Sequence, residues 1–267
     1  MNERDWRQGV DEQRPSPARV YDYFLGGSHN FAVDRAMAGQ LQQAMPDIGD
    51  IMRANRDYLG RAVRFLVNAG IRQFLDLGSG VPTVGNVHEL AQREAPDARV
   101  VYVDIDPVAV AHSAAILANN PETGIINADL RDADQVLAHE TTRELLDFDQ
   151  PIAVLLVGVL HQLPGDEPAD AVRRYRAVMA PGSYLALSQP TQDGRPAEAD
   201  AFTSTHARGY QETMVLRTRD EVASLLADFS MVAPGVVFLP QWHPVEPLID
   251  ETPGRLSTYA VVGKIPA

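Results

Sequence analysis

The sequence predicts an α/β fold in which a doubly wound, mostly parallel sheet carries helices on both faces. Three observations lead to this prediction. From residue 73 onward, short apolar segments alternate with helical patterns, as in parallel strands joined by crossover helices. The apolar run at residues 152–160 is typical of a strand that is buried on both faces. Two strand-like segments follow near the end of the sequence and predict a C-terminal antiparallel hairpin.

Seven strands follow from these patterns. The first five are expected to be parallel, and the seven cover residues 73–77, 99–104, 124–128, 152–160, 183–188, 231–239 and 256–263. Helical patterns occupy residues 86–94, 107–118 and 167–179. Asp106 before Pro107 is typical of a helix cap and first turn. Thr218 and Glu221 have the spacing of a capping box and predict another helix before the hairpin.

A helical extension is expected before the sheet, at residues 15–70. Two helices are predicted within it, at residues 36–45 and 57–69, and Gly70 is typical of the end of the second. Residues 1–14 are polar and predicted to be flexible. Residues 71–267 contain no internal repeat and no low-complexity linker, so we expect them to form one domain.

The composition narrows the class of function. The 267 residues include no cysteine, which excludes disulfides, thiolate metal ligands and cysteine nucleophiles. His88 and Glu89 begin a zinc-binding pattern, but Gln92 stands where its second histidine belongs, so no metal site is predicted. The net charge of −13 disfavours nucleic acid as a partner.

No segment is predicted to cross a membrane or to direct secretion. The run at residues 152–160 is far shorter than a bilayer requires, and the first residues are polar. We therefore expect a cytoplasmic protein with a small-molecule substrate. The sequence leaves its oligomeric state open.

A glycine turn follows the first predicted strand, in the sequence LDLGSGVPT at residues 75–83. Gly78 and Gly80 permit positive φ angles and a close approach of a ligand to the backbone. The third glycine of a dinucleotide-binding fingerprint is missing, because Pro82 and Thr83 stand there. Strand-to-helix turns also carry glycine for structural reasons, so the turn alone leaves both explanations open.

Three acidic residues lie near the ends of three successive strands, namely Asp76, Asp104 and Asp129. Ligands of open α/β sheets bind at the carboxyl ends of the strands. Asp104 follows Gly80 by 24 residues, close to the offset at which a carboxylate reaches ribose hydroxyls. A pyrophosphate would be repelled by Asp76 and Asp129, whereas a cofactor with a cationic centre, an amino group and an adenosine would not.

In their order along the chain, these motifs resemble those of class I S-adenosylmethionine-dependent methyltransferases. LDLGSG, VYVDID, NADL and IAVLLVGVLHQLP are similar to the first four motifs, and MAPGSYLALS to the fifth strand with its Pro-Gly turn. Together with RVYDYFLGGSHNFAVDR and RANRDYLGRAVRFL, they resemble an actinomycete family of methyltransferases formerly catalogued as a domain of unknown function. That family commonly has Lys-Asp-Asn where this chain has Ser28-His29-Asn30.

The resemblance implies a Rossmann-like seven-stranded sheet and a bound cofactor. The implied cofactor is S-adenosyl-L-methionine, with S-adenosyl-L-homocysteine as product. Gly78, Ser79 and Gly80 would bring backbone against the methionine part of the cofactor, and Asp76 would attract its ammonium group. Arg56 could pair with the cofactor carboxylate. Alternatively it is an exposed cation at a helix start, a place that the helix dipole disfavours.

The resemblance also implies an adenosine site at the ends of the second and third strands. Asp104 would hold the ribose hydroxyls, and Ile105 would pack on the adenine. Asp129, beside Leu130, would accept a hydrogen bond from the adenine amino group.

At the end of the fourth strand, Val157 and Gly158 would supply backbone to the cofactor, and the acceptor side is expected after them. His161 follows, and an imidazole with a pKa near neutrality could take a proton from the methyl acceptor. The alternative is a structural histidine bonded to a loop carbonyl. Residues 19–35 are expected to close the site as a lid. Tyr23, together with Tyr21, Phe24 and Phe31, would supply its wall.

Three functions remain open at this point. The first is an S-adenosylmethionine-dependent methyltransferase that acts on a small molecule. An NAD(P)-dependent oxidoreductase shares the glycine turn and the acidic ribose partner, although Pro82, Thr83 and Asp129 argue against it. The third is a non-catalytic S-adenosylmethionine-binding protein, which keeps the pocket without the chemistry.

Overall fold

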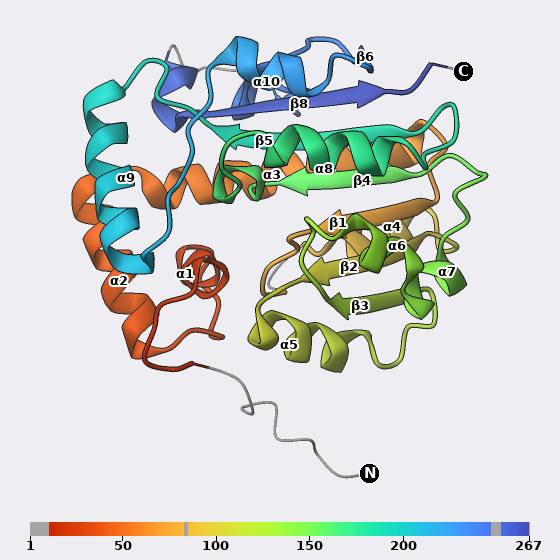
Figure 1. Ribbon diagram of the computed structural model, residues 1–267, viewed down its shortest axis with the longest axis horizontal. Coiled ribbons are helices and arrows are strands. Elements are labelled where there is room, and N and C mark those ends of the chain that lie inside the picture. The colour runs from red at the N-terminus through yellow and green to blue at the C-terminus, as the bar shows by residue number, and fades with distance from the viewer. Residues whose placement is uncertain (1–10, 83–84, 247–251, 267) are drawn as a thin grey trace.

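A mostly parallel sheet forms the centre of the computed structural model, which describes residues 11–82, 85–246 and 252–266. Within these ranges the sheet has the strand order β3-β2-β1-β4-β5-β8-β6, and β7 also pairs with β8 (Figure 1). The strands are β1 Gln73–Leu77, β2 Arg99–Asp104, β3 Thr123–Asn127, β4 Ala153–Val157, β5 Tyr184–Pro190, β6 Ser230–Met231, β7 Val237–Phe238 and β8 Thr258–Lys264. β1 to β5 are parallel, and β8 is antiparallel to β5, β6 and β7. The predicted fold class is confirmed.

The described residues form eight strands rather than the seven expected, because the segment predicted at residues 231–239 is divided. β6 pairs with the end of β8 at Gly263 and Lys264, and β7 pairs with its beginning. Pro234 has no N–H to donate between them, and Gly235 turns the chain with a φ of 84°. The ladder is therefore interrupted at this point.

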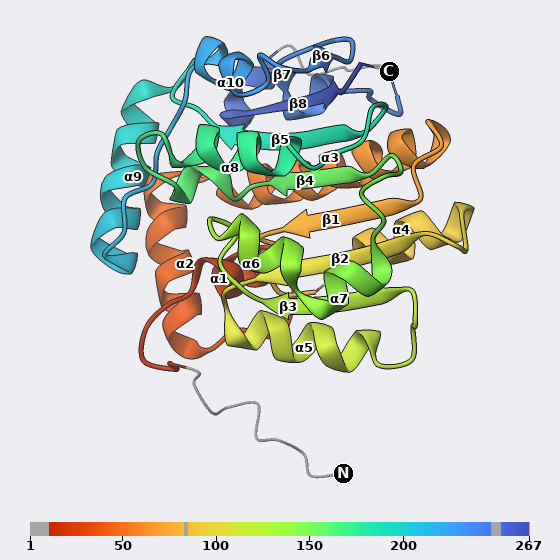
Figure 2. The ribbon, with the colours of Figure 1, turned by 45° about the vertical axis from the view of Figure 1, so that its right-hand side comes forward.

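Helices cover both faces of the sheet (Figures 1 and 2). α3, α4 and α5 contribute to the core on one face, and α6, α7, α8 and α10 to the core on the other. The helices are α1 Pro17–Phe24, α2 Ala32–Ala44, α3 Ile48–Asn68, α4 Val87–Glu94, α5 Pro107–Leu117, α6 Ala133–Ala138, α7 Glu140–Leu145, α8 Glu167–Arg176, α9 Pro196–Tyr210 and α10 Arg219–Leu225. In the part of the chain that the structure describes, short 3₁₀ turns lie at Leu160–Gln162, Leu239–Gln241 and Pro253–Leu256. Among the described helices, none combines the length and apolar composition needed to cross a bilayer.

The two-residue period of the strands separates the two cores. Leu75 and Leu77 of β1 face the α8 side, whereas Phe74 packs with α3 on the other side. The predicted caps are present as well. Asp106 Oδ1 accepts from Val108 N at 2.8 Å, and Glu221 N donates to Thr218 Oγ1 at 3.3 Å.

A third apolar cluster lies at the carboxyl ends of the parallel strands, where α1, α2 and α9 gather (Figure 1). Its members come mainly from α1 to α3, from α9 and from the last 3₁₀ turn, and include Val20, Phe24, Met37, Leu41, Ile48, Ile51, Phe202 and Leu256. α3 begins in this cluster and continues along the sheet, where its residues from Tyr58 to Val67 enter the core. α3 therefore packs against both the N-terminal helices and the sheet. The predicted domain boundary at residue 70 stays a prediction.

The segment predicted to be flexible, residues 1–14, lies largely outside the described residues. The described part of it is held by Arg19, whose Nη2 donates to the carbonyl oxygens of Asp11 and Arg14. Arg19 Nε also forms a buried ion pair with Asp34 at 2.8 Å. The chain just before α1 is therefore attached to the helical cluster.

Candidate functional site

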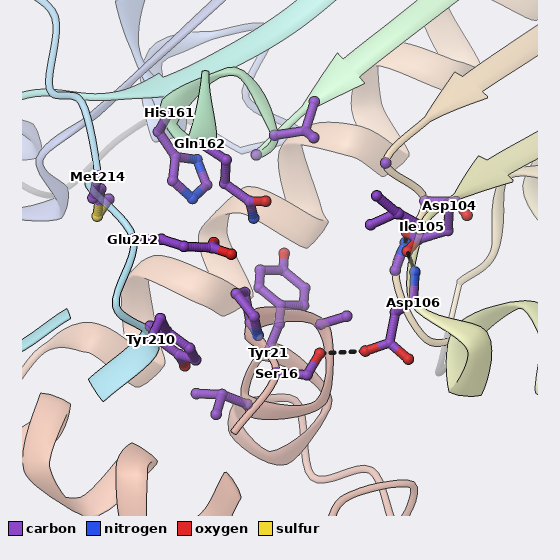
Figure 3. A pocket seen from close by; sticks show the side chains of 18 of the residues that line it. Ser16, Tyr21, Asp104, Ile105, Asp106, His161, Gln162, Tyr210, Glu212 and Met214 are labelled. Atoms are coloured by element: carbon purple, nitrogen blue, oxygen red, sulfur yellow. Dashed lines mark hydrogen bonds between the residues drawn. The ribbon is translucent and has the colours of Figure 1, made fainter. Parts of the chain in front are cut away.

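A cavity of about 760 Å³ opens at the carboxyl ends of β1, β2 and β4. α1 and α9 line its opposite side, together with the loop that follows α9 (Figure 3). Its size lies within the range of about 300–1,000 Å³ that is usual for small-molecule sites. Twelve of the thirteen residues predicted for the site line this cavity, and they are Arg56, Asp76, Gly78, Ser79, Gly80, Asp104, Ile105, Asp129, Leu130, Val157, Gly158 and His161.

The glycine turn is held tightly against β2 and the loop after β4. Gly78 N and Ser79 N both donate to the carbonyl oxygen of Val103, at 2.8 and 3.1 Å. Gly78 has a φ of 72°, and a Cβ there would collide with the side chain of Val159. Ser79 Oγ is buried and has no hydrogen-bond partner among the described residues. The turn therefore brings bare backbone and an unsatisfied hydroxyl to the cavity.

Two buried carboxylates adjoin this turn. Asp104 Oδ2 accepts from Gly80 N at 2.6 Å, and its Oδ1 accepts from Asp106 N at 2.8 Å. Burial raises the pKa of Asp104 to about 6. Burial also raises the pKa of Asp76 to about 7, although the Arg56 guanidinium lowers it in part. Such carboxylates favour a cationic or hydroxyl-bearing ligand.

A chain of hydrogen bonds runs beneath the end of β4. Ser188 Oγ donates to Asn55 Oδ1 at 2.6 Å, Asn55 Nδ2 donates to Tyr21 Oη at 3.1 Å, and Tyr21 Oη donates to the Met52 carbonyl oxygen at 3.1 Å. A Cβ on Gly158 would lie 2.9 Å from Asn55 Nδ2. The absence of a side chain at Gly158 therefore lets this network approach the β4 loop.

Arg56 lines the cavity as expected, but the prediction that it lies at a helix start is wrong. α3 begins at Ile48, so Arg56 lies inside the helix and not at its start. Its Cζ lies 5.9 Å from the centre of the Tyr21 ring. The helix-dipole argument therefore does not apply, and its proximity to Asp76 is the observation that remains.

The Asp129 carboxylate already has a partner within the protein, Arg131. Its Oδ1 accepts from Arg131 N at 2.9 Å, and its Oδ2 forms an ion pair with Arg131 Nη2 at 2.6 Å. Hydrogen bonding from Arg131 lowers the pKa of this carboxyl, which keeps it ionised. Beside it, Leu130 is buried, whereas the Ile105 side chain is 63% exposed at the cavity. An adenine amino group would therefore have to share Asp129 with Arg131.

His161 does not have the near-neutral pKa that was expected. Burial, the neighbouring His206 and the Arg217 guanidinium lower its pKa to about 3. The ring is therefore neutral at physiological pH and is a weak base. Its Nδ1 is buried without a hydrogen-bond partner in the described parts of the chain.

Tyr23 is the predicted site residue that lies outside the cavity. It is 40% exposed and packs edge-on against Phe24, which belongs to the helical cluster. Residues two apart on a helix point in different directions, so Tyr21 faces the cavity while Tyr23 does not. Tyr21 therefore takes the place that was assigned to Tyr23.

The loop after α1 folds around the Asp22 carboxylate. His29 N and Asn30 Nδ2 both donate to Asp22 Oδ2, at 2.9 and 2.8 Å. A Cβ on Gly27 would collide with this carboxylate. The segment Ser28-His29-Asn30 is therefore part of a local turn.

The whole chain matches one family model. The model describes an S-adenosyl methyltransferase and covers residues 3–266. The chain belongs to this S-adenosyl methyltransferase family. The enzyme is therefore a methyltransferase whose cofactor is S-adenosyl-L-methionine, as the sequence motifs imply.

Solved structures similar to this methyltransferase support the assignment. A candidate methyltransferase from Thermobifida fusca YX shares 43% identity over 97% of this chain and 98% of its own, with a TM-score of 0.92. A DUF574 family protein from Streptomyces avermitilis shares 34% identity over 96% of this chain and 99% of its own, with a TM-score of 0.89. The 1,6-didemethyltoxoflavin-N1-methyltransferase of Burkholderia thailandensis shares the fold at 17% identity, over 97% and 94% of the chains, with a TM-score of 0.50.

Sequence reasoning missed the part of this methyltransferase that faces the sheet across the cavity. α9 and the following loop contribute Phe202, His206, Tyr210, Glu212 and Met214 to the lining. A signal for α9 was available, because Pro196 opens it and its buried residues Ala199, Phe202 and His206 recur at helical spacing. No local pattern marks the loop.

A second missed contact joins the chain before α1 to the start of α5. Ser16 Oγ donates to Asp106 Oδ2, as the dashed line in Figure 3 marks. Asp106 is therefore both the cap of α5 and the attachment point of the residues before α1, which line the cavity.

Proposed function

We propose that this methyltransferase binds S-adenosyl-L-methionine at the glycine turn and methylates a small molecule at the α9 side of the cavity. The observation that carries the proposal is the buried Asp76 carboxylate, with a pKa raised to about 7, beside an unsatisfied Ser79 hydroxyl. A buried acid in this state is stabilised by a cation, and the methionine part of the cofactor carries an ammonium group.

The methionine part would lie against the turn. Asp76 would pair with the ammonium group, and Gly78, Ser79 and Gly80 would let it approach the backbone. Arg56 would pair with the cofactor carboxylate, and its influence on Asp76 supports this arrangement.

The adenosine part would lie across the ends of β2 and β3. Each Asp104 oxygen already accepts one backbone N–H and keeps a lone pair for a ribose hydroxyl. Ile105 and Leu130 supply apolar surface for the adenine ring. Asp129 would accept from the adenine amino group while it remains bonded to Arg131.

The acceptor would meet the methyl group near the end of β4, where Val157 and Gly158 supply backbone. When bound, the cofactor supplies an electrophilic methyl group, which a lone pair of the acceptor takes up as the carbon–sulfur bond breaks. The chain contributes position and exclusion of water. His161, neutral and weakly basic, would offer a hydrogen-bonding nitrogen and would not take up the acceptor's proton.

The cofactor assignment is tested by thermal unfolding in the presence of S-adenosyl-L-methionine, S-adenosyl-L-homocysteine, NAD and NADP. A ligand that binds the native state raises the melting temperature. We expect shifts with the two sulfur nucleosides and none with NAD or NADP. A shift with NAD or NADP alone would favour an oxidoreductase and overturn the proposal.

A non-catalytic protein is distinguished by turnover. We expect S-adenosyl-L-homocysteine to accumulate when the enzyme is incubated with S-adenosyl-L-methionine and a panel of small-molecule acceptors. Cofactor binding without product from any acceptor class would favour the non-catalytic alternative. The cytoplasmic location and the absence of a nucleic-acid partner stay predictions.

A further inference from the structure

One carboxylate enters the acceptor side of the cavity. Glu212, in the loop after α9, points toward the cavity between Gln162 and Tyr210 (Figure 3). Of the described lining residues that follow β4 in the chain, Glu212 is the one with a formal charge. The acceptor side therefore has a negative charge and no cation from this part of the chain.

This carboxylate is available to a ligand. Within the described ranges, Glu212 forms no ion pair and its carboxylate accepts no hydrogen bond, and the residue is exposed to solvent. Asp129, by contrast, is bonded to Arg131 through both of its oxygens. A carboxylate that projects into a cavity without a partner of its own can pair with a ligand cation.

The two histidines on this side of the cavity are neutral. Burial lowers the pKa of His206, as it does that of His161, so neither ring offsets the charge of Glu212 at physiological pH. The Nδ1 atoms of both rings are buried without a hydrogen-bond partner in the described residues. These rings can hydrogen-bond to a ligand, but they cannot neutralise an acidic one.

The walls around this carboxylate are aromatic and apolar. Phe202, Tyr210 and Met214 line the cavity, and the His206 and Tyr210 rings lie 4.5 Å apart. Aromatic and thioether groups of this kind pack against a planar ring. Tyr21, from α1, completes the enclosure.

We propose that the methyl acceptor is a ring-bearing amine whose ammonium group pairs with Glu212 and whose ring packs against Phe202, Tyr210 and Met214. This inference rests on the proposed function, since it concerns the acceptor side of the same cavity. A cationic acceptor next to the cofactor's sulfonium is repelled by it, and Glu212 offsets that repulsion. An acidic acceptor would be repelled by Glu212, and none of the described lining residues after β4 carries a positive charge that would compensate.

The test compares two probes of equal shape and opposite charge on the full chain saturated with S-adenosyl-L-homocysteine. Tyramine carries an ammonium group on a phenol ring, 3-(4-hydroxyphenyl)propionate carries a carboxylate at the same place, and 4-ethylphenol is the neutral reference. Calorimetry should give an affinity for tyramine at least about tenfold above that for the propionate.

The variant Glu212→Gln should remove this preference. We expect its affinity for tyramine to fall about tenfold and its affinity for 4-ethylphenol to change less than about twofold. Glu144→Gln is the matched control, because Glu144 is exposed on α7 and does not line the cavity. The control should bind all three probes as the unchanged chain does.

Three outcomes overturn the inference. They are a propionate that binds as tightly as tyramine, a Glu212→Gln variant that keeps the preference, and no binding of tyramine to the loaded protein. Binding of S-adenosyl-L-homocysteine is measured first and separately. If it fails, the proposed function itself is overturned, whereas tight cofactor binding with the wrong probe preference removes only the inference about the acceptor.

Discussion

Gly80 N donates a 2.6 Å hydrogen bond to Asp104 Oδ2 and so joins the glycine turn after β1 to the carboxyl end of β2. The two residues are 24 positions apart in the chain. The same carboxylate accepts from Asp106 N, so its orientation is set from both sides. An acid held in this way is a preorganised acceptor for hydroxyl groups.

Replacing Asp104 with Asn should weaken the cofactor site. An amide has one acceptor oxygen, so Asp104→Asn cannot accept from both Gly80 and Asp106 and still bind two ribose hydroxyls. We expect the affinity for S-adenosyl-L-homocysteine to fall at least about tenfold by calorimetry. Asp200→Asn, an exposed position on α9, should change nothing. Equal affinity for the Asp104 variant would contradict the ribose assignment.

Cofactor affinity should rise with pH around neutrality. The ionised form of Asp76 attracts the ammonium group, and burial raises its pKa to about 7. We therefore expect tighter binding of S-adenosyl-L-homocysteine at pH 8 than at pH 6, measured by calorimetry. Asp76→Asn should bind weakly at both pH values. A pH-independent affinity in the unchanged chain would argue against Asp76 as the ammonium partner.

The same carboxyl should make the ligand-free protein less stable at high pH. Burial raises the folded-state pKa of Asp76 to about 7 from its ordinary value of 3.8, so the folded state holds the proton more tightly than the unfolded chain does. Its contribution to stability is present below the ordinary pKa and is lost as pH rises through about 7. Without ligand, the free energy of unfolding of Asp76→Asn, measured with urea, should therefore exceed that of the unchanged chain by on the order of 2 kcal/mol at pH 8. At pH 4 the two chains should be about equally stable. Equal stability of the two chains at pH 8 would show that burial of the ionised Asp76 carboxylate does not destabilise the folded state.

Removing the Ser16 hydroxyl should weaken the attachment of the residues before α1 to Asp106 and let the bound ligand dissociate faster. Ser16→Ala loses the bond to Asp106 and no helix cap, because the Ser16 side chain does not cap α1. We expect S-adenosyl-L-homocysteine to dissociate several times faster in stopped-flow fluorescence. The free energy of unfolding should change by less than about 0.5 kcal/mol. An unchanged dissociation rate would show that this contact does not retain the ligand.

Adding a methyl group at Gly158 should disturb the network beneath β4. Gly158 has a φ of 71°, and a Cβ there would lie 2.9 Å from Asn55 Nδ2. Gly158→Ala should lower the free energy of unfolding by roughly 1–3 kcal/mol. Gly165→Ala is the matched control, since Gly165 also has a positive φ, 52°, but a Cβ there meets nothing within 4 Å. The excess cost at Gly158 measures the Asn55 contact, and equal costs would argue against it.

Much of the sheet could be predicted because its signals are local. The predicted bounds of β1 and β2 agree with the structure, and the caps at Asp106 and Thr218 are present. An apolar run, a glycine turn and a cap each depend on a few neighbouring residues. The strand order places the ends of β1, β2 and β3 side by side, so the acids near them could be expected to share one edge.

The errors arose where the answer depends on distant contacts. α3 begins earlier than predicted because Ile48 and Ile51 are buried against α1 and α2. The low pKa of His161 depends on burial and on His206 and Arg217, which follow it by many residues. The residues next to His161 in the sequence indicate neither its burial nor these distant neighbours.

The sequence by itself determined the family, the cofactor and the parallel strands, because each of these is indicated by short segments with regular spacing. Only the tertiary structure decided what faces the cofactor site across the cavity. There the packing of α1, α2, α3 and α9 into one apolar cluster brings Tyr21, Tyr210 and Glu212 to the same space. That meeting depends on burial of side chains from opposite parts of the chain, which no local pattern encodes.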